Sequence, residues 1–325
     1  MSIRRTVLVA FSLVLVGVLI LLLFRHFAPT PPLLPGAPGE RVVHFPKDRS
    51  MGVLLLCDSD AADLGEWEEF CEARGSVAVP AGKELMLEAF VPLLTRYRKL
   101  MWKAGLWKPP QPVYDLSPLG SLAPGDLQGL YVMAPSQISD ADLVHLKGLT
   151  SLRALALFST SISDAGLAHL ARLTSLERLA LYKIPITDAG LAHLEQLKAL
   201  RTLSLNGTAI TGPGLASLEG FRSLEYLDLS RTRIDDAALS HLKRLTELKQ
   251  LRLWQTRVGD AGLRHLRQMQ SLQHLDLSMT DITDAGLDHL AGLTSLQRLV
   301  IPEQISDTAL DELKKAFPKC DIRRR

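Results

Sequence analysis

Histidine recurs at a fixed interval in the second half of the chain, and it is the residue there that most directly suggests chemistry. Intervals of 24 residues or a multiple of 24 separate His145, His169, His193, His241, His265 and His289. Imidazole binds transition metals and titrates near neutral pH, so such a row could hold metal ions or sense pH. Equivalent residues on neighbouring helices lie roughly 8–10 Å apart, too far for two of them to share an ion. Because Ser217 and Glu312 take the same place in other copies, we interpret the histidines as tolerant surface residues.

Other signatures of catalysis or cofactor binding are absent from the sequence. There is no H-E-x-x-H, no G-x-S-x-G and no Walker loop, and "PAGKE" at 80–84 lacks the first glycine and the Ser/Thr of a phosphate loop. The three cysteines do not match a zinc spacing; Cys57 and Cys71 either form a bridge or are buried as small apolar residues, and Cys320 is expected in the core. We therefore predict a non-enzymatic protein without cofactor or metal.

The bulk composition agrees with a folded protein that does not bind nucleic acid. Of 325 residues 47% are hydrophobic, and the net charge is only +2. The single asparagine, Asn206, among many Arg, Ala, Gly and Pro residues suggests a GC-rich, bacterial genome.

The histidines belong to a 24-residue repeat, whose positions are numbered here from its first leucine. Regular copies begin at Leu149, Leu173, Leu197, Phe221, Leu245, Met269 and Leu293. Their pattern is L-x-x-L-x-x-L-x-L-x-x-T-x-I-[ST]-D-A-G-L-x-H-L-x-x. An irregular copy precedes them and the last one is a residue short, so we predict eight repeats over 124–316.

The spacing within the repeat predicts a strand, a turn and a short helix. Leucines at positions 7 and 9 alternate as on one buried face of a strand. Leucines at positions 19 and 22 share one face of a helix. Ser or Thr at position 15 and Asp at position 16 suit the helix start as N-cap and negative charge. Because one unit buries too little apolar surface to fold alone, we expect the units to stack into a solenoid with one parallel sheet.

This pattern resembles the leucine-rich repeat, and the copies look like its 24-residue bacterial subclass. The resemblance implies an α/β solenoid with a concave parallel β-sheet and convex short helices. One departure is threonine in place of the family's usual asparagine at position 12, in Thr160, Thr208, Thr232, Thr256 and Thr280. Hydroxyl groups can still satisfy turn backbone, so we expect the fold to be unchanged.

Glycine at position 18 has a different explanation from the usual one. It occurs at Gly166, Gly190, Gly214, Gly262 and Gly286, but Ala238 takes its place in one internal copy. Since alanine would be strained at positive φ, we interpret the glycine as a requirement for close packing between helices.

The N-terminus predicts a membrane anchor. After the short segment 1–6, which holds Arg4 and Arg5, residues 7–24 form an uncharged run of about 27 Å as a helix, enough to span a bilayer. A cleaved signal peptide is the alternative, but no A-x-A site follows. We predict a single-pass anchor with the C-terminal domain outside the cytoplasm, and residues 25–40 contain five prolines and form a stalk-like linker.

Two further segments lie between the linker and the repeats. Residues 41–92 show short apolar runs typical of a small β-rich module. Residues 93–123 begin with a basic amphipathic helix, which either caps the array or lies on the membrane surface. After the repeats, residues 317–325 form a C-terminal cap and basic tail.

Variable residues mark the candidate binding surface. Positions 6, 8 and 10 point out of the sheet on its concave face and differ between copies. The candidate partner-binding residues on and beside this face are Tyr131, Met133, Phe158, Tyr182, Lys183, Tyr226, Asp228, Arg252, Trp254, Asp276 and Arg298. Alternatively, Asp228, Arg252 and Asp276 form a cross-strand charge ladder that binds nothing.

Exposed aromatic side chains favour a protein ligand. We therefore predict a membrane-anchored module that binds a protein of unknown identity on its concave face. One alternative is a structural envelope or cell-surface component without specific recognition. A remote one is an adaptor resembling the repeats of F-box ubiquitin-ligase subunits.

Overall fold

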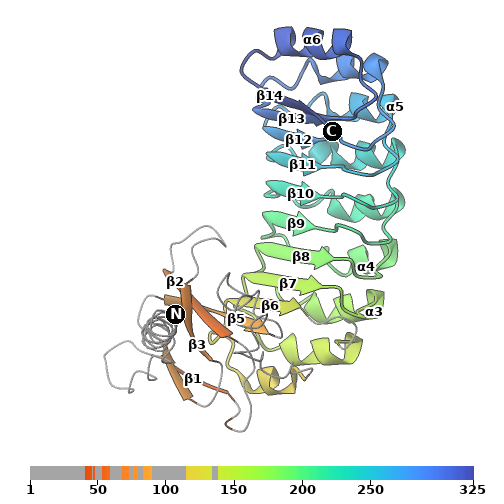
Figure 1. Ribbon diagram of the computed structural model, residues 1–325. Coiled ribbons are helices and arrows are strands. Elements are labelled where there is room, and N and C mark those ends of the chain that lie inside the picture. Colours follow the sequence, from red (N-terminus) through yellow and green to blue (C-terminus); the bar gives the residue numbers. More distant parts are fainter. Residues whose placement is uncertain are drawn as a thin grey trace, which may run out of the picture.

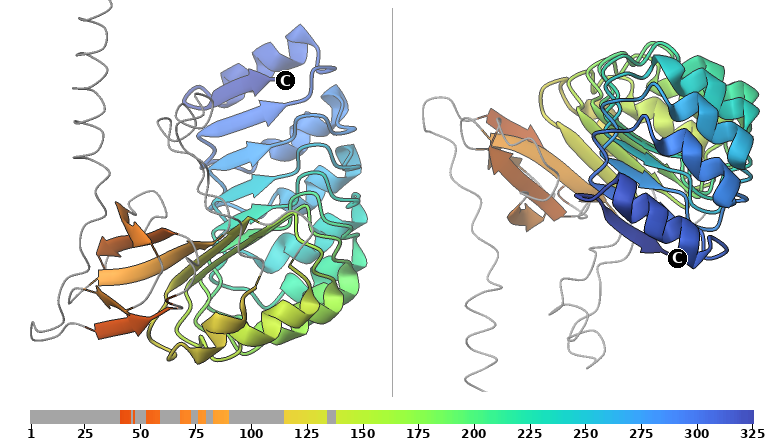
Figure 2. Two further views of the ribbon diagram at one scale, coloured as in Figure 1. Left: turned by 60° about the horizontal axis from the view of Figure 1, so that its bottom comes forward. Right: turned by 90° about the horizontal axis from the view of Figure 1, so that it is seen from above.

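The repeats form a curved stack with one continuous sheet on its inner side and short helices on its outer side (Figures 1 and 2). The computed structural model describes residues 41–45, 47, 53–58, 68–72, 76–79, 83–89, 115–133 and 138–325. One 12-stranded sheet contains a strand from every repeat, with the last strand of the chain at one edge and three N-terminal strands at the other. From the N-terminal strand β5 (Lys83–Ala89) to the C-terminal strand β14 (Asp321–Arg324), every neighbouring pair in this sheet is parallel. The predicted leucine-rich-repeat-like solenoid is confirmed.

Each repeat contributes one strand and one short helical segment. The strands are β6 (Gly129–Met133), β7 (Ala154–Phe158), β8 (Arg178–Tyr182), β9 (Thr202–Ser204), β10 (Tyr226–Asp228), β11 (Gln250–Arg252), β12 (His274–Asp276) and β13 (Arg298–Ile301). The helical segments are η3 (Asp140–Leu146), α3 (Asp164–Leu167) with η4 (Ala168–Leu170), α4 (Asp188–Ala192), η5 (Pro213–Leu218), η6 (Ala237–Arg244), α5 (Asp260–Leu263) with η7 (Arg264–Leu266), η8 (Asp284–Leu290) and α6 (Asp307–Ala316). Most of these segments are 3-10 helices of three to eight residues.

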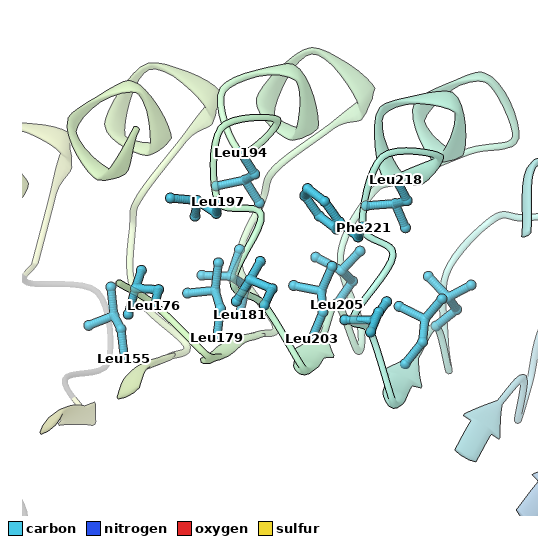
Figure 3. Close-up of a cluster of buried hydrophobic side chains, with 14 of the residues drawn as sticks. Leu155, Leu176, Leu179, Leu181, Leu194, Leu197, Leu203, Leu205, Leu218 and Phe221 are labelled. Carbon is cyan, nitrogen blue, oxygen red and sulfur yellow. The ribbon is translucent and has the colours of Figure 1, made fainter. Parts of the chain in front are cut away.

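A single hydrophobic core runs the length of the stack between the sheet and the helices. In the repeat that begins at Leu173, the seven predicted positions are at most 1% exposed. Strand leucines such as Leu179 and Leu181 face helix-side leucines such as Leu194, and Leu203 and Leu205 repeat the arrangement one unit on (Figure 3). Register pairs Leu179 with Leu203, so each unit's core side chains stack on those of the next.

The threonines at position 12 close the turn after each strand. Thr208, Thr232, Thr256 and Thr280 are buried, and each hydroxyl donates to the carbonyl oxygen three residues earlier at 2.6–2.7 Å. The expected role of these hydroxyls in satisfying turn backbone is therefore confirmed in four repeats. Thr160 is equally buried, but its hydroxyl has no partner in the described part of the chain.

Aspartate at position 16 links most repeats to the next. The carboxylate of Asp164 accepts hydrogen bonds from the backbone N–H of Thr187 at 2.7 Å and from its hydroxyl at 2.6 Å. The same contact recurs from Asp140 to Ser163, from Asp188 to Thr211 and from Asp260 to Thr283. A ladder of carboxylates thus joins successive helix starts. The predicted caps also form, since Ser163 and Thr187 accept from backbone N–H groups inside their helices.

The aspartate ladder explains the glycine at position 18. A Cβ built at Gly262 would lie 2.6 Å from Oδ1 of Asp236, and the other four glycines approach the preceding aspartate more closely still. Real Cβ atoms essentially never come so close. The expectation of close packing is confirmed, and the neighbour that imposes it is the carboxylate of the previous unit.

The N-terminal strands extend the sheet. Strands β2 (Val53–Asp58), β3 (Glu68–Glu72) and β5 (Lys83–Ala89) pair antiparallel, and β5 then pairs parallel with β6. A separate two-stranded sheet joins β1 (Arg41–His44) to β4 (Ser76–Val79). Register places Cys71 opposite Leu54, three residues from Cys57; this is about 10 Å along a strand and does not suit a disulfide.

The C-terminal segment is more regular than a basic tail. Helix α6 is followed by strand β14 (Asp321–Arg324), which pairs parallel with β13. Ile322 and Cys320 pack partly buried against the core, as expected for Cys320. Residues 317–325 therefore add one more strand to the solenoid.

Several predicted segments lie outside the described residues. These are the anchor at 7–24, the linker at 25–40 and most of the amphipathic segment; only 115–123 of the last is described, and it holds the 3-10 turn η2 (Ser117–Ser121). Within the described ranges, no helix is both long enough and apolar enough to cross a bilayer.

Candidate functional site

A row of aromatic rings crosses the first three repeat strands on the concave face. The ring centroids of Tyr131 and Phe158 are 5.6 Å apart and stacked, and those of Phe158 and Tyr182 are 5.8 Å apart. All three side chains are half-buried. Tyr131 lies directly opposite Ala156, whose small side chain lets the tyrosine reach Phe158 diagonally. We call Tyr131, Phe158 and Tyr182 the aromatic row. Met133 ends the first of these strands, but its side chain is outside the described part.

Lys183 extends the aromatic row at the edge of the sheet. Its ammonium nitrogen lies 5.1 Å from the ring centroid of Tyr182, within the range of a cation–π contact. The side chain is exposed. Its backbone has φ of 52°, a left-handed conformation that turns the chain away from the strand.

The left-handed residue is a constant of the repeat that the sequence did not reveal. Six successive residues at position 11 have positive φ, and only one of them is glycine: Ser159, Lys183, Gly207, Arg231, Gln255 and Met279. Each non-glycine residue there costs about 1–2 kcal/mol. The conformation persists because the backbone N–H continues the sheet, as from Lys183 to the carbonyl of Asn206 at 2.8 Å. Long side chains at position 11 are thereby presented at the carboxyl edge of the sheet.

The cross-strand charge ladder considered as an alternative for position 8 does not form. In the described part of the chain, no ion pair joins Asp228, Arg252 and Asp276, although they are register neighbours. Each aspartate instead accepts from the backbone N–H of the serine two residues later, at 2.9 Å for Ser230 and 3.0 Å for Ser278. Local turn donors satisfy these carboxylates, so the alternative interpretation as a ladder is wrong.

Two arginines on or next to strands β10 and β11 lie over aromatic rings. The guanidinium of Arg252 is 5.5 Å from the ring centroid of Tyr226, and that of Arg231 is 5.5 Å from Trp254. Burial, and then the charge of Asp228, raise the pKa of Tyr226, while Arg252 opposes the shift. Tyr226 therefore stays neutral and can donate a hydrogen bond.

The chain does contain a charge ladder, at position 5 and not at position 8. Arg153 contacts Glu84 at 2.5 Å and Glu177 at 2.9 Å, and Glu225 contacts Arg201 and Lys249, each at 2.6 Å. Apart from Glu84, which lies within β5, these residues immediately precede their strands, and the sign of the charge alternates between neighbouring units. The hydrogen bond to Glu177 raises the pKa of Arg153. The sequence pattern that could have predicted this ladder is the recurrence of charged residues every 24 positions with alternating sign of charge.

Arg298 is separate from both aromatic groups. Its Nε lies 3.5 Å from a carboxylate oxygen of Asp321 in the neighbouring strand β14. The predicted site residues therefore fall into three sets: the aromatic row with Lys183, the arginine–aromatic pairs with Asp228, and a C-terminal set with Asp276 and Arg298.

The repeated histidines lie on the convex side, partly or fully exposed. Nδ1 of His241 is 3.0 Å from Glu219 of the preceding unit. Burial lowers the pKa of His265. Among the described residues, no three His, Cys, Asp or Glu side chains are grouped so that they could hold a metal ion.

Comparisons with known proteins agree with the repeat fold. The family model described as "Leucine Rich repeat" matches residues 222–243 and 268–291. No curated protein matches the chain significantly. Leucine-rich repeats commonly form protein-binding modules, and nothing in the comparisons indicates catalytic activity.

Solved structures with a similar fold include bacterial and plant proteins. Internalin C2 from Listeria monocytogenes is 24% identical with a TM-score of 0.47, over 70% of this chain and 90% of that one. The ectodomain of the Arabidopsis thaliana membrane receptor kinase GASSHO1/SCHENGEN3, solved in complex with CASPARIAN STRIP INTEGRITY FACTOR 2, is 23% identical with a TM-score of 0.44. That match covers 57% of this chain and 22% of the ectodomain. Both likenesses concern the fold alone.

Proposed function

We propose that the protein is a non-enzymatic recognition module that binds a protein partner on its concave face, through the aromatic row and Lys183. The partner is expected to offer apolar or aromatic side chains to the rings. A carboxylate beside them would meet the ammonium group of Lys183.

One observation carries this proposal: three half-buried rings are in contact across neighbouring strands, on the face of the sheet opposite the core. The repeat does not need aromatic residues there. Asn206, Ser230 and Ser278 occupy the position of Phe158 and Tyr182 in other units and leave the strand pairing intact. Partly exposed rings that the architecture does not require are typical of a surface that is covered by a partner.

The test compares two variants of the full-length chain in the source organism. Phe158→Ala with Tyr182→Ala removes two rings, whereas Arg172→Ala changes an exposed residue on the convex side. We expect the wild type and the Arg172 variant to give the same yield of a crosslinked complex with the partner. The double variant should lower that yield at least about tenfold. Identical crosslinked proteins for all three would instead favour a structural component without specific recognition.

We further propose that residues 7–24 anchor the chain in a membrane as a single pass, with the repeats outside the cytoplasm. The uncharged run and the flanking Arg4 and Arg5 support this topology. Protease added to intact cells should digest the repeats. Protection until the cells are lysed would place them on the opposite side.

A further inference from the structure

A pocket of about 680 Å³ opens at the carboxyl ends of strands β11 to β14, apart from the aromatic row. Its lining comes from consecutive units: Trp254, then Asp276, Ser278 and Met279, then Glu303 and Gln304, and finally Arg325. Its volume falls in the range of about 300–1,000 Å³ that is typical of small-molecule sites.

Several acceptor atoms in the pocket have no hydrogen-bond partner among the described residues. Oδ1 of Asp276 accepts from both the backbone N–H and the hydroxyl of Ser278, which leaves Oδ2 without a partner in the described part of the chain. Nε2 of Gln304 donates to the carbonyls of Thr280 and Ile282 at 2.8 and 2.9 Å, and its Oε1 accepts no hydrogen bond from the described residues. Glu303 forms no ion pair with any described residue. A fitting ligand would therefore supply O–H or N–H donors to these oxygens and acceptors to the guanidinium of Arg325.

Charge around the pocket disfavours a cation as that ligand. Arg325 is part of the wall, the guanidinium of Arg231 lies 5.5 Å from the Trp254 ring, and Arg252 is the register neighbour of Asp276. These positive charges offset the two carboxylates. A neutral ligand with hydroxyl groups fits this mixed lining, because hydroxyl groups both donate to carboxylates and accept from a guanidinium.

Trp254 gives the pocket an apolar wall. Its side chain is half-buried, with Arg231 approaching from the preceding repeat and the pocket residues coming from the following ones. A flat ligand surface of C–H groups can lie against an indole ring and leave hydroxyl groups at its rim free for polar side chains.

From these features we propose that the pocket binds an oligosaccharide of pyranose units with equatorial hydroxyl groups. The C–H face of one sugar ring packs on Trp254. Hydroxyl groups donate to Oδ2 of Asp276 and to Glu303 and accept from Arg325. This site is distinct from the aromatic row and does not depend on the protein-binding proposal.

The experiment uses the full-length chain in a detergent without a sugar headgroup, with cellotriose and triacetylchitotriose as probes. Saturation-transfer NMR reports which sugar protons touch the protein, and calorimetry gives the affinity. We expect at least one trisaccharide to bind at millimolar concentration or better, with the strongest saturation on ring C–H protons. Trp254→Leu should weaken binding at least about tenfold, and Glu303→Ala about three- to tenfold.

Glu312→Ala is the matched control, because Glu312 is an exposed carboxylate on helix α6 outside the pocket; its affinity should equal that of the wild type. Exposed Glu303 can be removed without touching the core, so the proposal stays testable if the Trp254 variant folds poorly. Absence of binding by both sugars overturns the proposal. Unchanged sugar affinity in both pocket variants also overturns the proposal. A third contrary result is that the pocket binds a peptide probe, an acetylated lysine pentapeptide, and neither sugar. None of these results bears on Phe158 and Tyr182, which test the protein partner.

Discussion

Ala238 lies against Gly212. Alanine replaces the glycine that is usual at position 18, and glycine replaces the aspartate that is usual at position 16 of the preceding repeat. A Cβ built at Gly212 would lie 3.5 Å from the Cβ of Ala238, an ordinary van der Waals contact. At five other junctions these positions are aspartate and glycine, and the carboxylate fills the space of the missing Cβ. This is the internal junction between units 197–220 and 221–244. Ala309, the counterpart of Ala238 in the last repeat, belongs to the longer helix α6.

Restoring aspartate at this junction alone should destabilise the array. In Gly212→Asp the new carboxylate meets the methyl group of Ala238 and the existing carboxylate of Asp235, whose Oδ1 would be 3.4 Å from the new Cβ. We expect the free energy of unfolding to fall by about 1–3 kcal/mol in urea titrations.

The triple variant Gly212→Asp, Asp235→Thr and Ala238→Gly supplies the matched control, because it copies the junction between Asp164, Thr187 and Gly190. We expect it to recover most of the lost stability. If the triple variant is no more stable than the single one, the coupling between these positions is disproved.

Thr160 and Thr256 should respond oppositely to the same substitution. Thr256 donates to the carbonyl of Leu253 at 2.7 Å, so Thr256→Val leaves a buried acceptor unpaired and should cost about 1 kcal/mol. The Thr160 hydroxyl is buried without a described partner, so Thr160→Val should be neutral or stabilising by up to about 1 kcal/mol. Equal losses in thermal unfolding of the two variants would contradict the assignment.

The position-5 ladder should make stability depend on pH through Glu225. The hydrogen bond from Lys249, with the charges of Lys249 and Arg201, lowers the pKa of Glu225 below its ordinary value of 4.5. A lowered carboxyl pKa contributes stability that is present above pH 4.5 and is lost as pH falls through the folded-state pKa.

Glu225→Gln removes this contribution. The free energy of unfolding of the wild type should therefore exceed that of the variant by up to about 1 kcal/mol at neutral pH. This difference should shrink as the pH falls below 4.5. Denaturant titrations at a series of pH values measure it; a constant difference across the series would exclude the linkage.

The left-handed residue at position 11 predicts a pair of backbone effects. Gly207 has φ of 72°, so Gly207→Ala should destabilise by about 1 kcal/mol. Gln255 is exposed with φ of 56°, and Gln255→Gly should raise stability by up to about 1 kcal/mol because relief of strain exceeds the added unfolded-state entropy. Loss of stability in both variants would contradict this account.

Local periodicity was enough to predict the fold. Alternation at positions 7 and 9 and the three-residue step from 19 to 22 identify which side chains enter the core, and Leu179, Leu181, Leu191 and Leu194 are buried as those spacings require. The same alternation placed Phe158 and Tyr182 on the opposite face. These inferences succeed because strand and helix geometry fixes side-chain direction within a few residues.

Contacts between repeats were decided only by the tertiary structure. The sequence left a ladder of Asp228, Arg252 and Asp276 open as an alternative to partner binding, whereas charges pair at Arg153 and Glu177 and the ladder of aspartates runs between helix starts. The pairing of β5 with β6 and the pocket beside Trp254 were likewise invisible. Such contacts join residues more than 20 positions apart, so they depend on the offset between stacked units and on competing backbone donors, neither of which the repeat pattern encodes.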